Sequence, residues 1–103
     1  MPDPVLVVLD GRNIQSKAAF FQAFAAIDGV PDGMADNVDA LWDAITGHIE
    51  KPVELTWINA EDSRRTMGLD FLMILAVLQE AAQATAHIPD KPRLNLSLPA
   101  APH

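Results

Sequence analysis

The sequence predicts an α/β fold in which a small three-stranded, mainly parallel sheet packs against about four helices. Short apolar runs of strand length alternate along the chain with longer segments whose apolar residues recur at helical spacing. The predicted order is strand, helix, helix, strand, helix, helix, strand, which leaves enough chain between successive strands for right-handed crossovers. At 103 residues, the chain has the length of one domain built around one core.

The first strand is predicted at residues 5–9, a continuous apolar run rich in β-branched residues that Asp10 and Gly11 end. A run without polar alternation is typical of a strand that is covered on both faces. Ser16 can cap the helix that follows, whose apolar residues recur at helical spacing until residues 28–29 stop it. Residues 30–35 contain proline and glycine and are predicted to form a loop.

A second helix is predicted to begin near Asp36 or Asn37 and to end at Gly47 or soon after it. Residues 53–57 follow a proline and form a second predicted strand, rich in β-formers. Asn59 comes directly after this strand and can cap a short third helix.

Gly68 separates the short helix from a longer one, predicted from residue 69 to about residue 84 and apolar almost all round. Residues 85–92 hold two prolines and are predicted to form a loop. Residues 93–98 alternate strictly between polar and apolar, so three leucines share one face of a third strand. The large apolar side chains are expected in the core, among them Trp42, Trp57, Phe71 and Met73.

These elements make one domain at residues 1–98, followed by a mobile tail at residues 99–103. The chain has no cysteine, which excludes disulfides and thiolate metal sites and fits a reducing compartment. The proline-broken, acidic N-terminus is unlike a signal peptide, and the apolar stretch at residues 69–78 is about half the length of a membrane span. We therefore expect a cytoplasmic protein that is monomeric when free and needs no cofactor.

The charge is strongly one-sided. Fourteen acidic and seven basic side chains give a net charge of −7, which argues against binding to nucleic acid or to an anionic membrane. Between residues 18 and 50 the chain has no lysine or arginine, although six carboxylates fall there. A block of like charge with no counter-charges is typical of an interaction surface, so a basic partner is expected.

The predicted second helix concentrates this charge on one side. At roughly 100° per residue, its large apolar residues fall within about a 100° arc that faces the core. Its carboxylates fall within about 60° on the opposite side, with the small residues Ala40 and Gly47 nearby. The apolar set is Val38, Leu41, Trp42, Ile45 and Ile49, and the acidic set is Asp36, Asp39, Asp43 and Glu50.

Asp43 conflicts with local folding preferences. It repels Asp39 one turn away, it lies too far along the helix to gain from the helix dipole, and aspartate is a poor helix former. Because sequences tend to break local rules at functional sites, a functional role for Asp43 is the better explanation.

Two other functions are compatible with this acidic face. One is a small enzyme with a Mg²⁺ site made by Asp36, Asp39 and Asp43, but no phosphate-binding glycine-rich loop or positioned base accompanies them. The three histidines, His48, His87 and His103, are scattered and suggest no catalytic triad, so we expect no enzyme. The other is an acidic module that binds a basic partner without any nuclease activity, which needs the same charged face.

The stretch from Asn37 to Gly47, with the Glu-Lys-Pro turn that follows at residues 50–52, resembles the signature helix of the barstar family of intracellular ribonuclease inhibitors. Residues 5–14 resemble the first strand and turn of that family, and residues 74–81 resemble its last helix. The resemblance covers nearly the whole chain up to residue 98, and it implies the family's α/β fold.

The resemblance also implies a mode of action, in which the second helix and the loop before it plug a ribonuclease active site. Asp43 then places its carboxylate where the substrate phosphate would lie, and Asp39 pairs with another basic residue of the enzyme. Glu80 matches an acidic contact on the last helix. The remaining contact positions that the resemblance implies are Asn37, Val38, Ala40, Thr46 and Gly47.

The chain departs from the family pattern at two further positions of the implied interface. Gly33 stands where the family prototype has a contact tyrosine, and His48 replaces an aromatic residue just after the helix. Since aromatic anchors usually dominate interface energies, these changes leave the target open between barnase, a different ribonuclease and a toxin domain with another basic cleft.

Overall fold

The computed structural model describes residues 4–27, 37–48, 51–87 and 93–99, without the side chain of His48. It contains a sheet of three parallel strands, β1 (Val5–Asp10), β2 (Val53–Ile58) and β3 (Leu94–Ser97), in the order β1-β2-β3. The register pairs Val5 with Val53 and Val53 with Leu94. The predicted α/β fold class and the parallel sheet are therefore confirmed.

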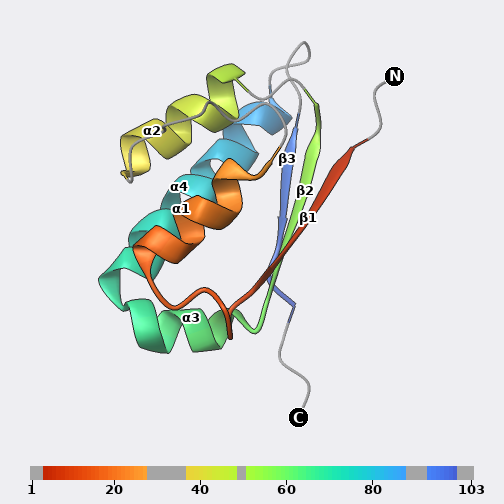
Figure 1. Cartoon of the computed structure of the whole chain (residues 1–103). Helices are drawn as coiled ribbons and strands as arrows, with labels where there is room; N and C mark the ends of the chain where they lie inside the picture. Colours follow the sequence, from red (N-terminus) through yellow and green to blue (C-terminus); the bar gives the residue numbers. More distant parts are fainter. Residues whose placement is uncertain (1–3, 28–36, 49–50, 88–92, 100–103) are drawn as a thin grey trace.

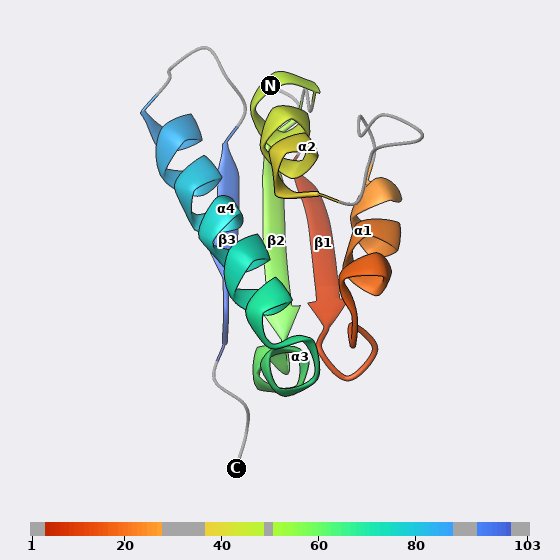
Figure 2. The same cartoon turned by 90° about the vertical axis from the view of Figure 1, so that its left-hand side faces the viewer.

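Four α-helices complete the fold: α1 (Lys17–Ala25), α2 (Val38–Asp43), α3 (Ala60–Met67) and α4 (Leu69–Ala86). A π-helical turn, η1 (Ala44–His48), continues α2. Helices α1, α2 and α4 lie on the same face of the sheet, and α3 lies beyond the ends at which β1 and β2 finish (Figures 1 and 2). The molecule thus has a helical layer on one face of the sheet and an open face on the other.

The core fills the space between the sheet and this helical layer. Trp57 on β2 is fully buried and stacks on Phe20 of α1 with ring centroids 5.4 Å apart. Phe71 of α4 packs edge-on against the same indole at 5.1 Å. Such aromatic pairs contribute about 0.5–1.5 kcal/mol each beyond the area they bury. The prediction that Trp57 and Phe71 belong to the core is confirmed.

The prediction that β1 is covered on both faces is wrong. Leu6 and Val8 point away from the helices and expose 70% and 65% of their surface, whereas Leu9 is buried. The reason is that α1, α2 and α4 all cover the same face of the sheet, which leaves the outer face of β1 in solvent. An apolar run alone does not distinguish a strand covered on one face from a strand covered on two.

Helix α4 is longer than predicted, because Thr85 belongs to it and not to a loop. The Thr85 hydroxyl is buried, donates to the carbonyl of Ala81 at 2.8 Å and accepts from the backbone N–H of Leu94 at 3.0 Å. This accepted bond ties the end of α4 to the start of β3. The strand itself is shorter than predicted and ends at Ser97, so Leu98 lies beyond it and is exposed.

One side of α4 belongs to the core, and the other does not. Phe71, Ile74 and Leu78 are buried, while Met73 exposes 53% of its surface, so its predicted place in the core is wrong. By length and composition, α4 is the one helix within the described residues that could cross a membrane, with a mean hydropathy of 1.3. Within the molecule, 28% of this span is buried.

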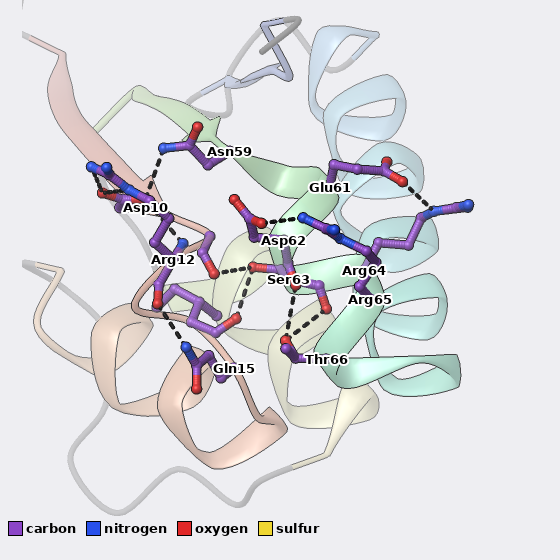
Figure 3. A network of polar contacts seen from close by, with 12 residues as sticks. Asp10, Arg12, Gln15, Asn59, Glu61, Asp62, Ser63, Arg64, Arg65 and Thr66 are labelled. Atoms are coloured by element: carbon purple, nitrogen blue, oxygen red, sulfur yellow. Dashed lines mark hydrogen bonds and ion pairs between the residues drawn. The ribbon is translucent and has the colours of Figure 1, made fainter. Parts of the chain in front are cut away.

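A polar network closes the end of the sheet where β1 and β2 finish (Figure 3). The buried hydroxyl of Ser63 accepts from the Trp57 indole N–H at 3.1 Å and donates to the carbonyl of Ile14 at 2.8 Å. Asn59 has a left-handed backbone conformation with φ 52°, and its side-chain amide donates a hydrogen bond to the Asp10 carboxylate at 3.0 Å. Asn59 makes no side-chain cap on α3, so that prediction is wrong: its amide joins β1 to β2 instead.

The Asp10 carboxylate is the most strongly hydrogen-bonded acid of this network. The Arg12 side chain, the Asn59 amide and the Arg12 backbone N–H all donate to it and hold the pKa of Asp10 well below its ordinary value of 3.8. Because these bonds favour the charged form, they stabilise the fold above the unfolded-state pKa. This contribution is lost as the pH falls from about 4 towards the lower pKa of the folded state.

We therefore predict that Asp10→Asn removes part of the acid sensitivity of the protein. The variant is less stable than the wild type near neutral pH, and the difference narrows as the pH falls from about 5 to 2. Urea unfolding followed by circular dichroism at several pH values measures this difference. The control is Glu54→Gln, an exposed change on the outer face of β2. It is expected to leave the pH dependence of the free energy of unfolding unchanged. If the free energies of unfolding of the wild type and of Asp10→Asn change with pH in parallel, Asp10 is not a source of the acid sensitivity.

A candidate protein-binding surface on helix α2

Helix α2 separates its apolar and acidic residues as the helical wheel predicts. Leu41 is fully buried, and Val38 and Trp42 are half-buried against the core. Asp39 and Asp43 are both exposed. Among the residues that the structure describes, neither carboxylate has a hydrogen-bond or ion-pair partner. The two charges that the sequence singles out are therefore available at the surface.

The start of α2 is fixed by Asn37, which confirms the predicted boundary. Its side-chain oxygen accepts a hydrogen bond from the backbone N–H of Ala40 at 2.8 Å, as an N-cap should. Asn37 therefore has a structural role, whatever contact it makes with a partner. Asp39 lies in the first turn, where a carboxylate interacts favourably with the helix dipole, and Asp43 ends the helix without that benefit.

The end of the helix widens into the π-helical turn η1, which the sequence pattern did not predict. The Thr46 hydroxyl donates to the carbonyl of Trp42 at 2.8 Å within this turn, and Ala44 and Ile45 are buried beneath it. A methyl group added at Gly47 would meet nothing within 4 Å. Single π-helical turns are frequent at functional sites, and Gly47 leaves this one open to close approach.

Helix α4 packs directly against α2 and extends the acidic surface. Glu80 is exposed on α4, so the predicted contact residues Asp39, Asp43 and Glu80 lie on two neighbouring helices. Neither α2, η1 nor α4 contains a lysine or arginine. Glu80 was predicted as a contact residue through the family resemblance, and the structure places it on a helix that packs against α2.

Some residues of the predicted contact surface and of the two sides of the predicted second helix lie outside the described part of the chain. They are Gly33, Asp36, Ile49 and Glu50, together with the side chain of His48. Within the described ranges, no group of three or more His, Cys, Asp or Glu residues could hold a metal ion. The alternative Mg²⁺ site needs Asp36 together with Asp39 and Asp43. Because Asp36 lies outside the described residues, the structure does not test this site.

The basic residues near the polar network are already paired. Arg64 contacts Glu61 at 3.5 Å, and Arg65 contacts Asp62 at 2.5 Å, both within α3. Helix α3 lies at the opposite end of the strands from α2 (Figure 1), so these cations do not neutralise Asp39 or Asp43.

Exposed carboxylates on α2, with no lysine or arginine in α2, η1 or α4, define a small α/β protein with an acidic surface. The family model described as "Barstar (barnase inhibitor)" matches residues 5–97. The chain belongs to the barstar family. It is also 31% identical over 77 residues to a Bacillus subtilis (strain 168) protein named "Putative ribonuclease inhibitor YrdF", covering 75% of this chain and 85% of that protein. Both the family description and the name of this relative refer to inhibitors.

We predict that Asp43→Ala leaves the stability of the free protein unchanged or raises it by about 0.5 kcal/mol. The change removes the repulsion of Asp39 and replaces aspartate by a better helix former. Urea denaturation followed by circular dichroism measures the free energy of unfolding. A loss of more than about 1.5 kcal/mol would mean that Asp43 supports the fold as a hydrogen-bond partner, and the functional interpretation of this residue would fail.

Proposed function

We propose that this protein is an intracellular inhibitor, of the immunity type, that blocks the active site of a basic ribonuclease with helix α2. The observation that carries the proposal is the pair of exposed carboxylates Asp39 and Asp43 on a surface of α2 and α4 without a lysine or arginine. Membership of the barstar family supports a ribonuclease as the class of target.

The chemistry of the target explains why carboxylates serve as inhibitory groups. A ribonuclease binds a polyanion, so its active site collects arginine, lysine and histidine side chains around the phosphate. A carboxylate accepts the same charge-assisted hydrogen bonds as a phosphate oxygen. Asp43, at the end of α2, occupies the phosphate position in this proposal, and Asp39 pairs with a second cation. Glu80 contacts the rim of the cleft from α4.

The rigidity of α2 adds to the affinity. Leu41 of α2 and Ile45 of η1 are buried, and Asn37 fixes the first turn of α2, so the backbone that carries the acidic side chains is held in place before the partner arrives. Less conformational entropy is lost when a rigid element binds. The net charge of −7 also attracts a basic enzyme over a distance and speeds association.

Capture on the immobilised protein tests the proposal. Lysate and culture medium of the source organism are passed over the wild type and over a matched Asp39→Asn, Asp43→Asn control, and the bound fractions are assayed for RNA cleavage. We expect a ribonuclease on the wild-type resin that is absent from the control resin. Recovery of a basic protein without nuclease activity would favour the acidic binding module instead, and recovery of acidic proteins alone would contradict both functions.

A further inference from the structure

Helix α4 carries a continuous apolar stripe on its exposed side. Leu69, Leu72 and Met73 expose 75%, 50% and 53% of their surface, and Ala76, one turn further on, is also exposed. Their spacing of three and four residues places them side by side on one face of the helix. We call this set, Leu69, Leu72, Met73 and Ala76, the α4 stripe.

Folding of this chain does not require the stripe to be apolar. The core side of α4 is formed by other residues, including Phe71, Ile74 and Leu78. The hydrogen bond that joins α4 to β3 lies at the opposite end of the helix, between Thr85 and Leu94. Exposed contiguous apolar side chains on a small protein are typical of a binding surface.

The α4 stripe runs into the proposed inhibitory surface. Glu80 follows Ala76 and Met73 at the same helical spacing, so it lies on the same face of α4. The distance along the helix from Leu69 to Glu80 is roughly 16 Å, at 1.5 Å per residue. An interface of standard size buries about 800 Å² on each partner, which is wide enough to include both Glu80 and the stripe. Figure 2 shows the whole length of α4 on the same side of the molecule as α2.

The charge around the stripe indicates its occupant. The described carboxylates of α4 itself are Asp70 and Glu80, and neither α4 nor the neighbouring α2 carries a lysine or arginine. The arginines of α3, the helix before the stripe, are paired with the acids of that same helix. A second copy of this chain docked here would bring like charges together, which is unfavourable for association. A basic partner would instead pair with them.

We propose that the α4 stripe is a second, apolar part of the inhibitory interface and packs against an apolar surface that adjoins the basic cleft of the target ribonuclease. This inference rests on the proposed function and extends it. The stripe supplies apolar contact area in a chain that has Gly33 and not an aromatic residue at one implied contact position. Asp43 and Asp39 select a basic cleft, and Leu72 and Met73 select a target with apolar residues next to it.

A double substitution of the stripe tests this inference, with the ribonuclease recovered on the immobilised wild type as the probe. Leu72→Gln with Met73→Gln keeps helix propensity while removing the apolar surface. The matched control is Leu6→Thr with Val8→Thr, which changes two exposed apolar residues on the other face of the sheet. Calorimetry is expected to show a Kd raised roughly 10-fold or more for the stripe variant and a change below about 2-fold for the control.

The heat capacity of binding gives a second readout. Because burial of apolar surface makes this heat capacity change negative, the stripe variant should bind with a less negative value, which a purely electrostatic contact would not alter. Urea unfolding establishes that both double variants are folded.

The other outcomes are distinguishable. If the stripe variant binds like the wild type while Asp43→Ala loses binding, the α4 stripe is not part of the interface and the proposed function stands. If Asp43→Ala also binds like the wild type, the proposed function fails and the extension fails with it. If sedimentation shows a wild-type dimer that the stripe variant converts to a monomer, a second copy covers the stripe and the inference is wrong.

Discussion

Replacing Asp43 by Ala is expected to weaken binding of the target ribonuclease by about 2–5 kcal/mol or more, mainly through faster dissociation. The carboxylate enters a cleft of cationic groups, and its truncation leaves those groups buried without a partner. Asp39→Ala should have the next largest effect. Glu80→Ala, at the rim, should act chiefly on the association rate. Stopped-flow kinetics with the three variants at two salt concentrations measures these contributions separately.

Salt provides an internal check on this order of effects. Exposed charges are screened beyond about 8–10 Å at physiological ionic strength, so added salt should slow association of the wild type. The free Asp43→Ala variant is expected to be as stable as the wild type, which separates a binding defect from a folding defect. If Asp43→Ala binds like the wild type while substitutions of Arg64 and Arg65 abolish binding, the interface lies elsewhere on the molecule.

Replacing Gly11 by Ala is expected to destabilise the fold by about 3 kcal/mol, because the site is overpacked. An added Cβ would lie 1.8 Å from the backbone carbonyl oxygen of Asn59 and 3.0 Å from the Ser63 hydroxyl. The nearest obstacle is backbone at the end of β2, which cannot rotate out of the way as a flexible side chain can. Relief of the clash must therefore separate the ends of β1 and β2 and disturb the polar network around Ser63.

Gly47→Ala is the matched control for this prediction. A Cβ at Gly47 meets nothing within 4 Å, so the substitution removes a poor helix former without a clash. Its stability is expected to stay the same or to rise by up to about 1 kcal/mol. Urea denaturation of the two glycine variants gives the comparison. Equal destabilisation at both positions would mean that the close approach at Gly11 has no special energetic role.

The helices with clear apolar and polar sides could be predicted well from the sequence. Ser16 and Asn37 cap α1 and α2 as expected, because each is a good N-cap residue directly before a segment with helical periodicity. The exposure of Asp39 and Asp43 follows from the same periodicity, which places Leu41 in the core. N-caps and helical periodicity could be predicted because they depend only on residues that are close together in the sequence.

Other features depend on contacts between distant parts of the chain. Asn59 looks like a helix cap in the sequence, but its side-chain amide donates a hydrogen bond to Asp10, which lies 49 residues earlier. Helix α4 is apolar all round, so periodicity cannot tell Phe71, which is buried, from Met73, which is exposed. The β1 run gives the same ambiguity for Leu6 and Val8. For α4 and β1, the number of layers in the fold decides which side chains are exposed, and no local pattern encodes it.

The candidate site shows the same division. The acidic side of α2 could be predicted from charge and periodicity, whereas Glu80 was predicted through the family resemblance, and the contact between α4 and α2 became known only from the structure. The π-helical turn at Ala44–His48 has no sequence signal that we recognise. The identity of the target could not be predicted, because it depends on the surface of the target molecule as well as on this chain.

Titration of the recovered ribonuclease with this protein tests the central proposal most directly. If α2 blocks the active site, RNA cleavage should fall linearly with added wild type and stop at one equivalent, while the same amount of the Asp39→Asn, Asp43→Asn variant leaves the enzyme active. A ribonuclease that stays fully active when saturated with bound wild-type protein would contradict active-site inhibition.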